Sequence, residues 1–442
     1  MKRGERVGRI RWTILAMLFT VTVINYAVRA ALSLAAPALS ADLGIDKLQL
    51  GVVFSAFGWS YCVAQMPGGW LLDRFGSVRV YLVAIVTWSA LTIAHSAVVW
   101  MSGSAAVTLL FVLRFLVGIA EAPSFPGNAR IVAQWFPARE RGTASAIFNA
   151  AQYFATVLFA PLLGWIISGY GWEWSFVFMG AVGLLAALLW VRVVHEPRHH
   201  PRVGEAELQL IASGGGMVDL AAGTPETEAN GETRRKLSVL LTNRTLWGLY
   251  LGQFFINTLT FFFITWFPVY LMEERGLSVV KAGLFATVPA VCGFIGGVIG
   301  GMFSDWLLRR GHSLTIARKV PVIGGMLIAL TILGCNYVES NTMVLVFMSL
   351  AFFGKGVGAL GWAVVSDVAP QDSAGLSGGI FNMFGNVSSI LSPIVIGYIL
   401  KETGSFDLVL GLVAGAALAA ALSFLLLVGK IERVGGNSPQ NV

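Results

Sequence analysis

Four ionisable side chains stand deep inside otherwise apolar stretches of the sequence: Arg29, Arg114, Glu121 and Lys355. A fifth, Asp367, lies near the end of such a stretch. A charge at the centre of a membrane costs about 2.5–3.5 kcal/mol on insertion scales, so such residues usually mark a binding or transport site. Three cations against one deep acid predict an anion site. The planar arginine fork suits a carboxylate, because it donates two parallel charge-assisted hydrogen bonds.

The spacing of these charges indicates how they could share one site. At a helical rise of about 1.5 Å per residue, Arg29 and Arg114 lie at similar depths in their helices. Arg114 and Glu121 are seven residues apart and therefore share a helix face. In a purely structural network, Arg114 would pair with Glu121 while Arg29 capped backbone carbonyls. That network leaves Lys355 without an acid.

Amide, phenol and hydroxyl side chains accompany the charges at helical spacing. Each could serve as an interhelical hydrogen-bonding group, but their number favours a wet cavity for a polyhydroxylated solute. Trp362 is flanked by small residues, and we expect its ring to lie against a sugar-like carbon chain. The polar pairs are Asn25 and Tyr26, Tyr61 and Gln65, Asn149 and Gln152, Gln253 and Asn257, Trp362 and Ser366, and Asn382 and Asn386.

Composition identifies the solvent of this chain as lipid. Of 442 residues, 56% are hydrophobic and only 12% are charged, about half the charged share of a soluble protein. The net charge of +7 comes from short basic clusters between apolar runs, which excludes a nucleic-acid track and indicates cytoplasmic loops. The three cysteines lack the spacing of a disulfide framework or a metal site. We expect no cofactor, and no catalytic constellation emerges, so an enzyme is not expected.

Twelve segments are long enough to span a membrane, at about 20 apolar residues each. We therefore expect an all-α membrane protein, with twelve transmembrane helices in two pseudo-symmetric six-helix bundles. The expected divisions are an N-terminal bundle at 1–196, a cytoplasmic linker at 197–245, and a C-terminal bundle with a short tail at 246–442. The distribution of Lys and Arg predicts that both termini are cytoplasmic.

An internal repeat supports the division into halves. "GGWLLDRFGSVR" follows the second segment and "GGMFSDWLLRRGHSLTIARK" follows the eighth. Each has a glycine pair, then an acid and then basic residues. The basic charge that is common to cytoplasmic loops would not explain the repeated glycines and acid. The residues that recur in the two loops are Gly69, Asp73, Arg74, Gly76 and Arg79, with their counterparts Gly301, Asp305, Arg309 and Arg310.

These residues resemble the major facilitator superfamily, whose signature loop reads Gly-x-Leu-x-Asp-Arg-x-Gly. The resemblance implies that the loops latch a cytoplasmic gate. Longer stretches, among them "EAPSFPGNARIVAQWFP", "FFFITWFPVYL" and "AFFGKGVGALGWAVVSD", resemble the anion:cation symporter branch. Within it, the chain is most similar to D-glucarate/D-galactarate permeases and next to D-galactonate permeases.

The resemblance assigns roles to individual side chains. It implies that Arg29 binds the substrate carboxylate and that Glu121 carries a proton. Lysine at 355 is typical of the glucarate-type pattern and not of the galactonate type, so we expect it to meet a second carboxylate. The expected substrate-binding residues are Tyr26, Arg29, Tyr61, Arg114, Gln152, Lys355, Trp362, Ser366 and Asn382.

Val28 departs from the pattern of this branch. The motif usually reads "INYADRA", with an aspartate that takes up a proton, whereas this sequence reads "INYAVRA". Valine cannot titrate, so the usual second proton-coupling site is gone. Three interpretations stay open: coupling through Glu121 alone with fewer protons, an uncoupled facilitator, or a substitution introduced to trap one state.

The sequence therefore predicts a secondary transporter that imports a hexarate, such as glucarate or galactarate, by proton symport with alternating access. We expect a monomer in a bacterial inner membrane, whose partners are the sugar acid, protons and lipid, with no metal and no nucleic acid. The alternatives are a galactonate or other monocarboxylate symporter, an uncoupled facilitator, and a sugar-acid sensor that does not transport.

Overall fold

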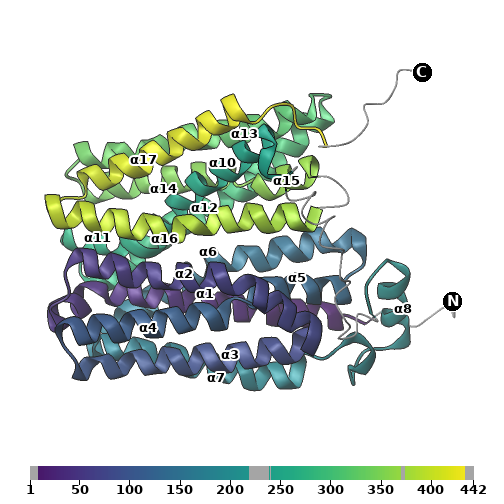
Figure 1. The fold of residues 1–442 in the computed structure, drawn as a ribbon, viewed down its shortest axis with the longest axis horizontal. Helices are drawn as coiled ribbons and strands as arrows, with labels where there is room; N and C mark the ends of the chain where they lie inside the picture. Colours follow the sequence, from purple (N-terminus) through teal and green to yellow (C-terminus); the bar gives the residue numbers. More distant parts are fainter. Residues whose placement is uncertain (1–7, 219–237, 239, 370–373, 434–442) are drawn as a thin grey trace. The chain divides into compact units, whose positions relative to one another are not determined.

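The computed structural model describes residues 8–218, 238, 240–369 and 374–433, and the regular elements of this part are helices (Figure 1). Eleven helical stretches in it are long and apolar enough to cross a membrane. The twelfth long helix, α2 (Lys47–Phe75), has 29 residues and spans about 44 Å. It is more polar than the others, since it carries Ser60, Tyr61 and Gln65. The twelve-helix all-α prediction is confirmed.

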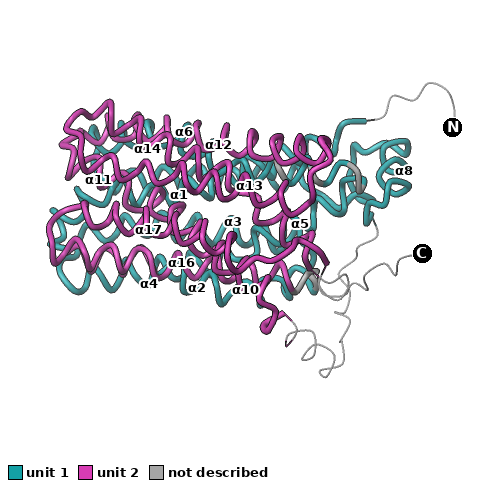
Figure 2. The backbone as a smooth tube through the Cα atoms, turned by 90° about the horizontal axis from the view of Figure 1, so that it is seen from above, with its two compact units in different colours: residues 1–45, 56–226 teal, residues 46–55, 227–442 magenta. Residues whose placement is uncertain are grey.

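The chain forms two compact units (Figure 2). Unit 1 comprises residues 1–45 and 56–226, and unit 2 comprises residues 46–55 and 227–442. The bundle and linker boundaries expected from the sequence stay a prediction.

Unit 1 is organised around its first helix, α1 (Ile10–Leu43). The buried alanines Ala27, Ala31 and Ala35 recur every four residues along it, so neighbouring helices can approach its backbone closely. It packs against α6 (Ala138–Tyr170) and α7 (Trp172–Val193), and α3 (Ser77–Ala94) packs against α7. These contacts determine which way the polar side chains of α1 face.

Unit 2 is built around the helix pair α12 (Val279–Arg309) and α14 (Asn341–Val357), with α13 (Leu314–Ala329) on the other side of α14. On its other flank, α10 (Arg244–Phe261) packs against α16 (Ala374–Thr403) and α17 (Asp407–Leu422). Tyr250, Phe381 and Phe424 are almost completely buried there. A π-helical turn, η3 (Phe262–Trp266), joins α10 to α11 (Phe267–Glu273).

The fourth span of each half is broken at the same place. In unit 1, α4 (Gly103–Glu121) stops at Ala122 and α5 (Ser124–Trp135) resumes after Pro123. In unit 2, α14 ends at Val357 and α15 (Gly361–Val368) begins after three intervening residues. A buried charge lies at or just before each break, Glu121 in one and Lys355 in the other.

A glycine from the neighbouring helix packs against each break. A Cβ on Gly68 of α2 would lie 3.2 Å from the Pro123 ring, and one on Gly300 of α12 would lie 2.4 Å from the Val357 carbonyl oxygen. A Cβ on the second glycine of each pair, Gly69 or Gly301, would meet nothing within 4 Å among the described residues outside its own helix backbone. The repeated "GG" therefore places its first member, not its second, in the close helix contact.

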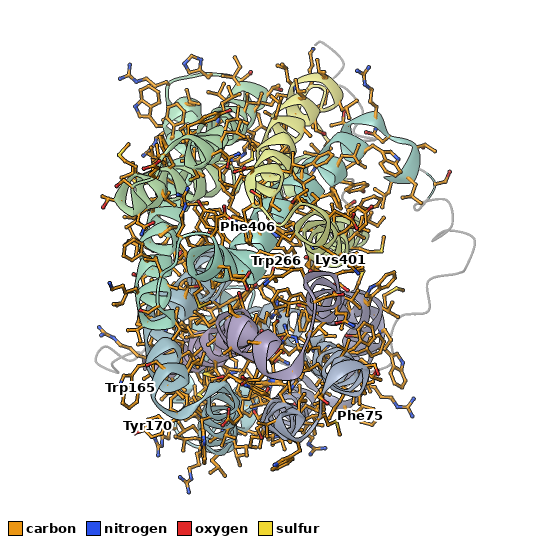
Figure 3. All side chains as sticks on the ribbon, turned by 90° about the vertical axis from the view of Figure 1, so that its left-hand side faces the viewer. Phe75, Trp165, Tyr170, Trp266, Lys401 and Phe406 are labelled. Atoms are coloured by element: carbon orange, nitrogen blue, oxygen red, sulfur yellow. The ribbon has the colours of Figure 1, made fainter. Side chains whose placement is uncertain are left out.

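The first turns of α2 belong to unit 2 and begin with a capping box. Asp46 Oδ1 accepts from the Gln49 amide at 2.8 Å, and Gln49 Oε1 accepts from the Asp46 amide at 2.9 Å. The Gln49 N–H stabilises the carboxylate and lowers the pKa of Asp46. Lys401 Nζ lies 3.3 Å from Asp46 Oδ2, Lys47 pairs with Glu273, and Phe54 meets Trp266 edge-on (Lys401 and Trp266 are labelled in Figure 3).

The glycine contact at the break of unit 2 can be tested with a matched pair of variants. Gly300→Ala forces a Cβ against the Val357 carbonyl, and overpacking of this kind typically costs about 1–3 kcal/mol. Gly301→Ala adds a methyl group in open space and should be neutral or slightly stabilising, since alanine favours helix. We expect Gly300→Ala to lower the melting temperature of the purified protein by several degrees. Equal melting temperatures for the two variants would contradict the contact.

Candidate functional site

Arg29 is buried in unit 1 and forms an ion pair with Glu121. Its Nη2 and Nε donate to Glu121 Oε2 at 2.9 and 3.1 Å, and Nη2 also donates to Asn25 Oδ1 at 3.0 Å. Arg29 is 9% exposed and Glu121 is completely buried. Glu121 Oε1 has no hydrogen-bond partner among the described residues. The pair thus leaves one carboxylate oxygen uncommitted.

Three aromatic rings surround the Arg29 guanidinium. Its Cζ lies 4.8 Å from the Tyr26 ring centre, 4.3 Å from that of Phe57 and 5.3 Å from that of Tyr61. The Phe57 and Tyr61 rings stack on each other with centroids 5.1 Å apart. Aromatic faces attract a cation and restrict its orientation. The structure therefore brings the predicted residues Tyr26, Arg29 and Tyr61 together.

Arg114 faces the same ring from α4. Its Cζ lies 5.5 Å from the Phe57 ring centre, and its Nε is buried without a hydrogen-bond partner in the described part of the chain. The structural network considered from the sequence joined Arg114 to Glu121, whereas the structure pairs Glu121 with Arg29. Sequence reasoning missed Phe57, which contacts both arginines. Its place four residues before Tyr61 was the available signal.

The remaining candidates of unit 1 lie on α1 and α6. Gln152 is half-buried and its Nε2 donates to the Asn149 carbonyl at 3.2 Å, within its own helix. Val28 is 2% exposed, so an aspartate at this position would be a buried acid next to Arg29 in sequence.

In unit 2, two glycines hold Lys355 in place. A Cβ on Gly354 would lie 2.4 Å from the Gly325 carbonyl oxygen of α13, and one on Gly356 would lie 2.2 Å from that of Gly293 on α12. Both neighbouring helices therefore touch α14 on either side of Lys355. Lys355 is 5% exposed, and its Nζ lies 5.2 Å from the Phe352 ring centre.

The other candidates of unit 2 lie on α15 and α16. Trp362 is 53% exposed and meets Phe381 edge-on at 5.2 Å. Ser366, one turn later, donates to the Trp362 carbonyl at 2.8 Å, which places both residues on one face of α15. Asn382 accepts from Asn386 through its backbone carbonyl and its side-chain oxygen.

The residues expected to form the gate lie where α2 and α12 end. Gly76 has a φ of +82°, a conformation that favours glycine, and it precedes α3. Arg74 and Arg79 are exposed in unit 1, and Asp305, Arg309 and Arg310 are exposed in unit 2. Arg310 lies 4.9 Å from the Trp306 ring centre. The helical position of Asp73 is described, but its side chain is not.

Sequence reasoning also missed a polar link in each unit between the third span and the second part of the broken span. In unit 1, Tyr81 donates to Asn128 Oδ1 at 2.9 Å. In unit 2, Arg318 Nε donates to Asp367 Oδ2 at 2.8 Å and its Nη1 donates to Ser304 at 2.9 Å. Among the described residues, no group of three or more His, Cys, Asp or Glu is placed to hold a metal ion.

The sequence of this chain also matches a known protein family. The model of the Major Facilitator Superfamily matches residues 18–388, and the chain belongs to this superfamily of membrane transporters. It is therefore a transport protein rather than an enzyme, as the sequence predicted.

Individual relatives narrow the comparison. A Bacillus subtilis (strain 168) protein named "Probable galactarate/D-glucarate transporter" is 55% identical over 428 residues, which are 96% of this chain and 93% of that protein. The protein of the same name from Escherichia coli (strain K12) is 54% identical, over 97% of this chain and 96% of its own length. A "D-galactonate transporter" from Escherichia coli O6:H1 is 41% identical, over 98% of this chain and 99% of its own length.

Solved structures agree on the fold. The D-xylose-proton symporter superposes with a TM-score of 0.73 at 15% identity, over 95% of this chain and 98% of that one. A bacterial homologue of the human lysosomal transporter Spinster gives 0.67 at 18% identity, over 96% of each chain. At these identities the likeness shows the fold alone.

The Arg29–Glu121 pair makes a testable prediction about stability. Glu121→Met leaves a buried guanidinium without its carboxylate, and breaking a buried pair in this way typically costs about 3–5 kcal/mol. Arg29→Met combined with Glu121→Met removes both charges and should recover most of the loss. The measurement is the melting temperature of each variant. Glu402→Met, at an exposed acid, is the control, and additive losses in the double variant would contradict the pairing.

Proposed function

We propose that this protein imports a hexarate, such as glucarate or galactarate, across a bacterial inner membrane by proton symport. The names of the close relatives support the substrate class. The buried Arg29–Glu121 pair carries the proposal for coupling, because it joins a carboxylate-binding side chain directly to a titratable one. Both termini are proposed to be cytoplasmic, in line with the basic loops.

The pair suggests how one proton could control substrate binding. While Glu121 is ionised, it holds two donors of the Arg29 fork. A proton on Glu121 removes the negative charge, and Arg29 is then free to donate its parallel N–H groups to a substrate carboxylate. The rings of Tyr26, Phe57 and Tyr61 hold the guanidinium in place during this exchange. Arg114 adds a second positive charge near the same anion.

The second carboxylate of a hexarate is assigned to Lys355. The glycines on either side of it let two helices hold α14 closely, so the backbone that carries Lys355 is fixed. Gln152, Asn382 and Ser366 are proposed to bind the hydroxyl groups, and Trp362 is proposed to pack against the carbon chain. Alternating access then requires the loops after α2 and α12 to act as a gate, with the two halves rocking about the bound solute.

Two narrower alternatives keep specific support. Val28 supplies no proton, which favours an uncoupled facilitator if Glu121 alone does not couple. The 41% identity to a D-galactonate transporter favours a monocarboxylate substrate, which has no second carboxylate to bind at Lys355. We place both below proton-coupled hexarate import, because Glu121 is present and the hexarate relatives are more similar.

Uptake of labelled glucarate into proteoliposomes tests the proposal. We expect accumulation above the external concentration only when a proton gradient points inward, because Glu121 ties substrate binding to protonation. Uptake that merely equilibrates, with or without the gradient, would contradict symport and support the facilitator.

A variant of Glu121 separates coupling from binding. Glu121→Gln cannot release a proton, and we expect it to lose gradient-driven accumulation. It should still exchange internal for external glucarate, because Arg29 is then permanently free. If Glu121→Gln accumulated glucarate like the unmodified protein, Glu121 would not be the coupling residue.

Selectivity for two carboxylates is tested at Lys355. Loss of one charged hydrogen bond costs about 1.5–3 kcal/mol, so Lys355→Asn should raise the KM for glucarate about 10- to 100-fold. Any galactonate transport should change far less, because that substrate has one carboxylate. Lys430→Asn, at an exposed lysine, is the matched control. An unchanged KM for glucarate in Lys355→Asn would reject this role.

A further inference from the structure

The segment after α7 contains a completely buried acid, Glu207, in a short helix, α8 (Glu205–Ser213). The sequence predicts that this stretch is part of a cytoplasmic linker. A buried carboxylate needs hydrogen-bond donors or a counter-ion to offset its lost hydration. Its neighbour Glu205, two residues earlier on the same helix, is exposed.

Glu207 caps the beginning of α1. Its Oε2 accepts from the Ile10 amide at 3.2 Å, and its Oε1 accepts from the Arg11 amide at 3.1 Å. The cap residue Arg9 offers these amides no side-chain acceptor. The first N–H groups of a helix lack internal hydrogen-bond partners and carry partial positive charge. The Glu207 carboxylate accepts hydrogen bonds from two of them, and its negative charge offsets their partial positive charge.

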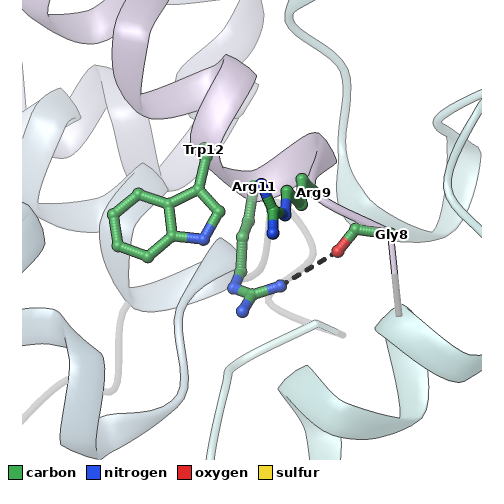
Figure 4. Close-up of a pocket in the computed structure, with 4 residues that line it drawn as sticks. All are labelled: Gly8, Arg9, Arg11 and Trp12. Carbon is green, nitrogen blue, oxygen red and sulfur yellow. Dashed lines mark hydrogen bonds between the residues drawn. The ribbon is translucent and has the colours of Figure 1, made fainter. Parts of the chain in front are cut away.

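The Arg11 side chain extends the same contact to α6. Its Nη1 lies 3.2 Å from Glu207 Oε1 and its Nε lies 3.0 Å from Glu140 Oε2. Nη1 also donates to the Gly8 carbonyl at 3.2 Å, beside a surface hollow of about 620 Å³ lined by Gly8, Arg9, Arg11 and Trp12 (Figure 4). One arginine between two acids therefore joins α1, α6 and α8.

The residues around α8 hold the far end of α5 as well. The Met217 amide donates to the Ala133 carbonyl at 2.9 Å, and Arg141 donates to the carbonyl groups of Ala133 and Gly215. On the other side of this end, Trp135 Nε1 donates to the His195 carbonyl at 3.2 Å.

The ring of Trp135 also meets His200 edge-on, with centroids 5.4 Å apart. Partial burial lowers the pKa of His200, which favours a neutral imidazole in this contact. Segments on both sides of α8 are thus folded onto unit 1.

We propose that residues 195–217 form a clasp that binds the ends of α1, α5 and α6 in unit 1, with Glu207 as its latch. Its partner is a surface of the same chain: the first amides of α1, Arg11, and the carbonyl groups that end α5. Of the helices that it holds, α1 carries Tyr26 and Arg29, and α6 carries Gln152. The third, α5, begins three residues after Glu121.

The clasp restrains α5, which the break in the fourth span leaves without support from α4. The break at Ala122 and Pro123 separates α5 from α4, so α5 lacks the stiffness of a continuous helix. The clasp fixes its far end against the beginning of α1, while Arg29 and Glu121 join α1 to the end of α4. The positioning residue Glu207 therefore acts on the candidate site through α1 and α5, without touching it.

Two variants of the full-length protein open the clasp by different routes. Glu207→Leu removes the latch, and Gly8→Val leaves it intact but places a Cβ 2.3 Å from Glu207 Oε2. Glu205→Leu is the same substitution at the exposed acid and serves as the control. Amide hydrogen exchange in detergent is measured for all three, and we expect at least ten-fold faster exchange at residues 8–16, 130–136 and 205–217 in the first two only.

A transport measurement then separates positioning from simple tethering. This measurement rests on the proposed function. We expect labelled glucarate uptake to have a Vmax several-fold lower in Glu207→Leu and Gly8→Val, and a KM within two-fold of that of the unmodified protein. Exchange in both variants equal to that of Glu205→Leu would overturn the clasp. Faster exchange with unchanged Vmax would overturn its positioning role. If the unmodified protein did not transport glucarate, the proposed substrate would fail, and the exchange result would still decide whether the clasp exists.

Discussion

The burial of Arg29 is the constraint on which the arrangement of unit 1 depends. A guanidinium at this depth requires a counter-ion, hydrogen-bond acceptors and a surface that holds its plane, and Glu121, Asn25 and three aromatic rings supply them. These groups come from α1, α2 and α4, so satisfying one charge fixes the rotation of three helices about their axes. The alanine stripe of α1 then allows α6 and α7 to close on its other face.

The two units share a device that positions a charge. In each, the fourth span breaks beside a buried ionisable residue, and the first glycine of a repeated pair packs against that break. Breaking a helix inside a membrane frees backbone groups that need other partners, so such breaks are tolerated where they are buried in protein or line a water-filled cavity. The charge differs in sign between the copies: Glu121 in one, Lys355 in the other.

Much of this was predictable from the sequence, for physical reasons. Hydrophobic length identified the spans, and the rarity of deep charges singled out the candidates. The pairing was not predictable: a seven-residue spacing shows that Arg114 and Glu121 share a face but does not say which helix lies opposite. The role of Phe57 was hidden for the same reason. The role of Glu207 was not predictable, because a charged residue in a polar stretch is normally exposed to solvent. Only the structure shows that the beginning of α1 buries it.

The opposite charges at equivalent breaks have a consequence for how such a protein can be re-engineered. An acid can change its charge during a cycle, whereas Lys355 lies on a helix backbone that two glycine contacts hold in place. Under the proposed function, the copy with Glu121 supplies the proton step and binds one carboxylate through Arg29, and the copy with Lys355 binds the second carboxylate. A substitution at Lys355 would then change which second group of the solute is accepted, while the Arg29–Glu121 pair of the other copy stays intact.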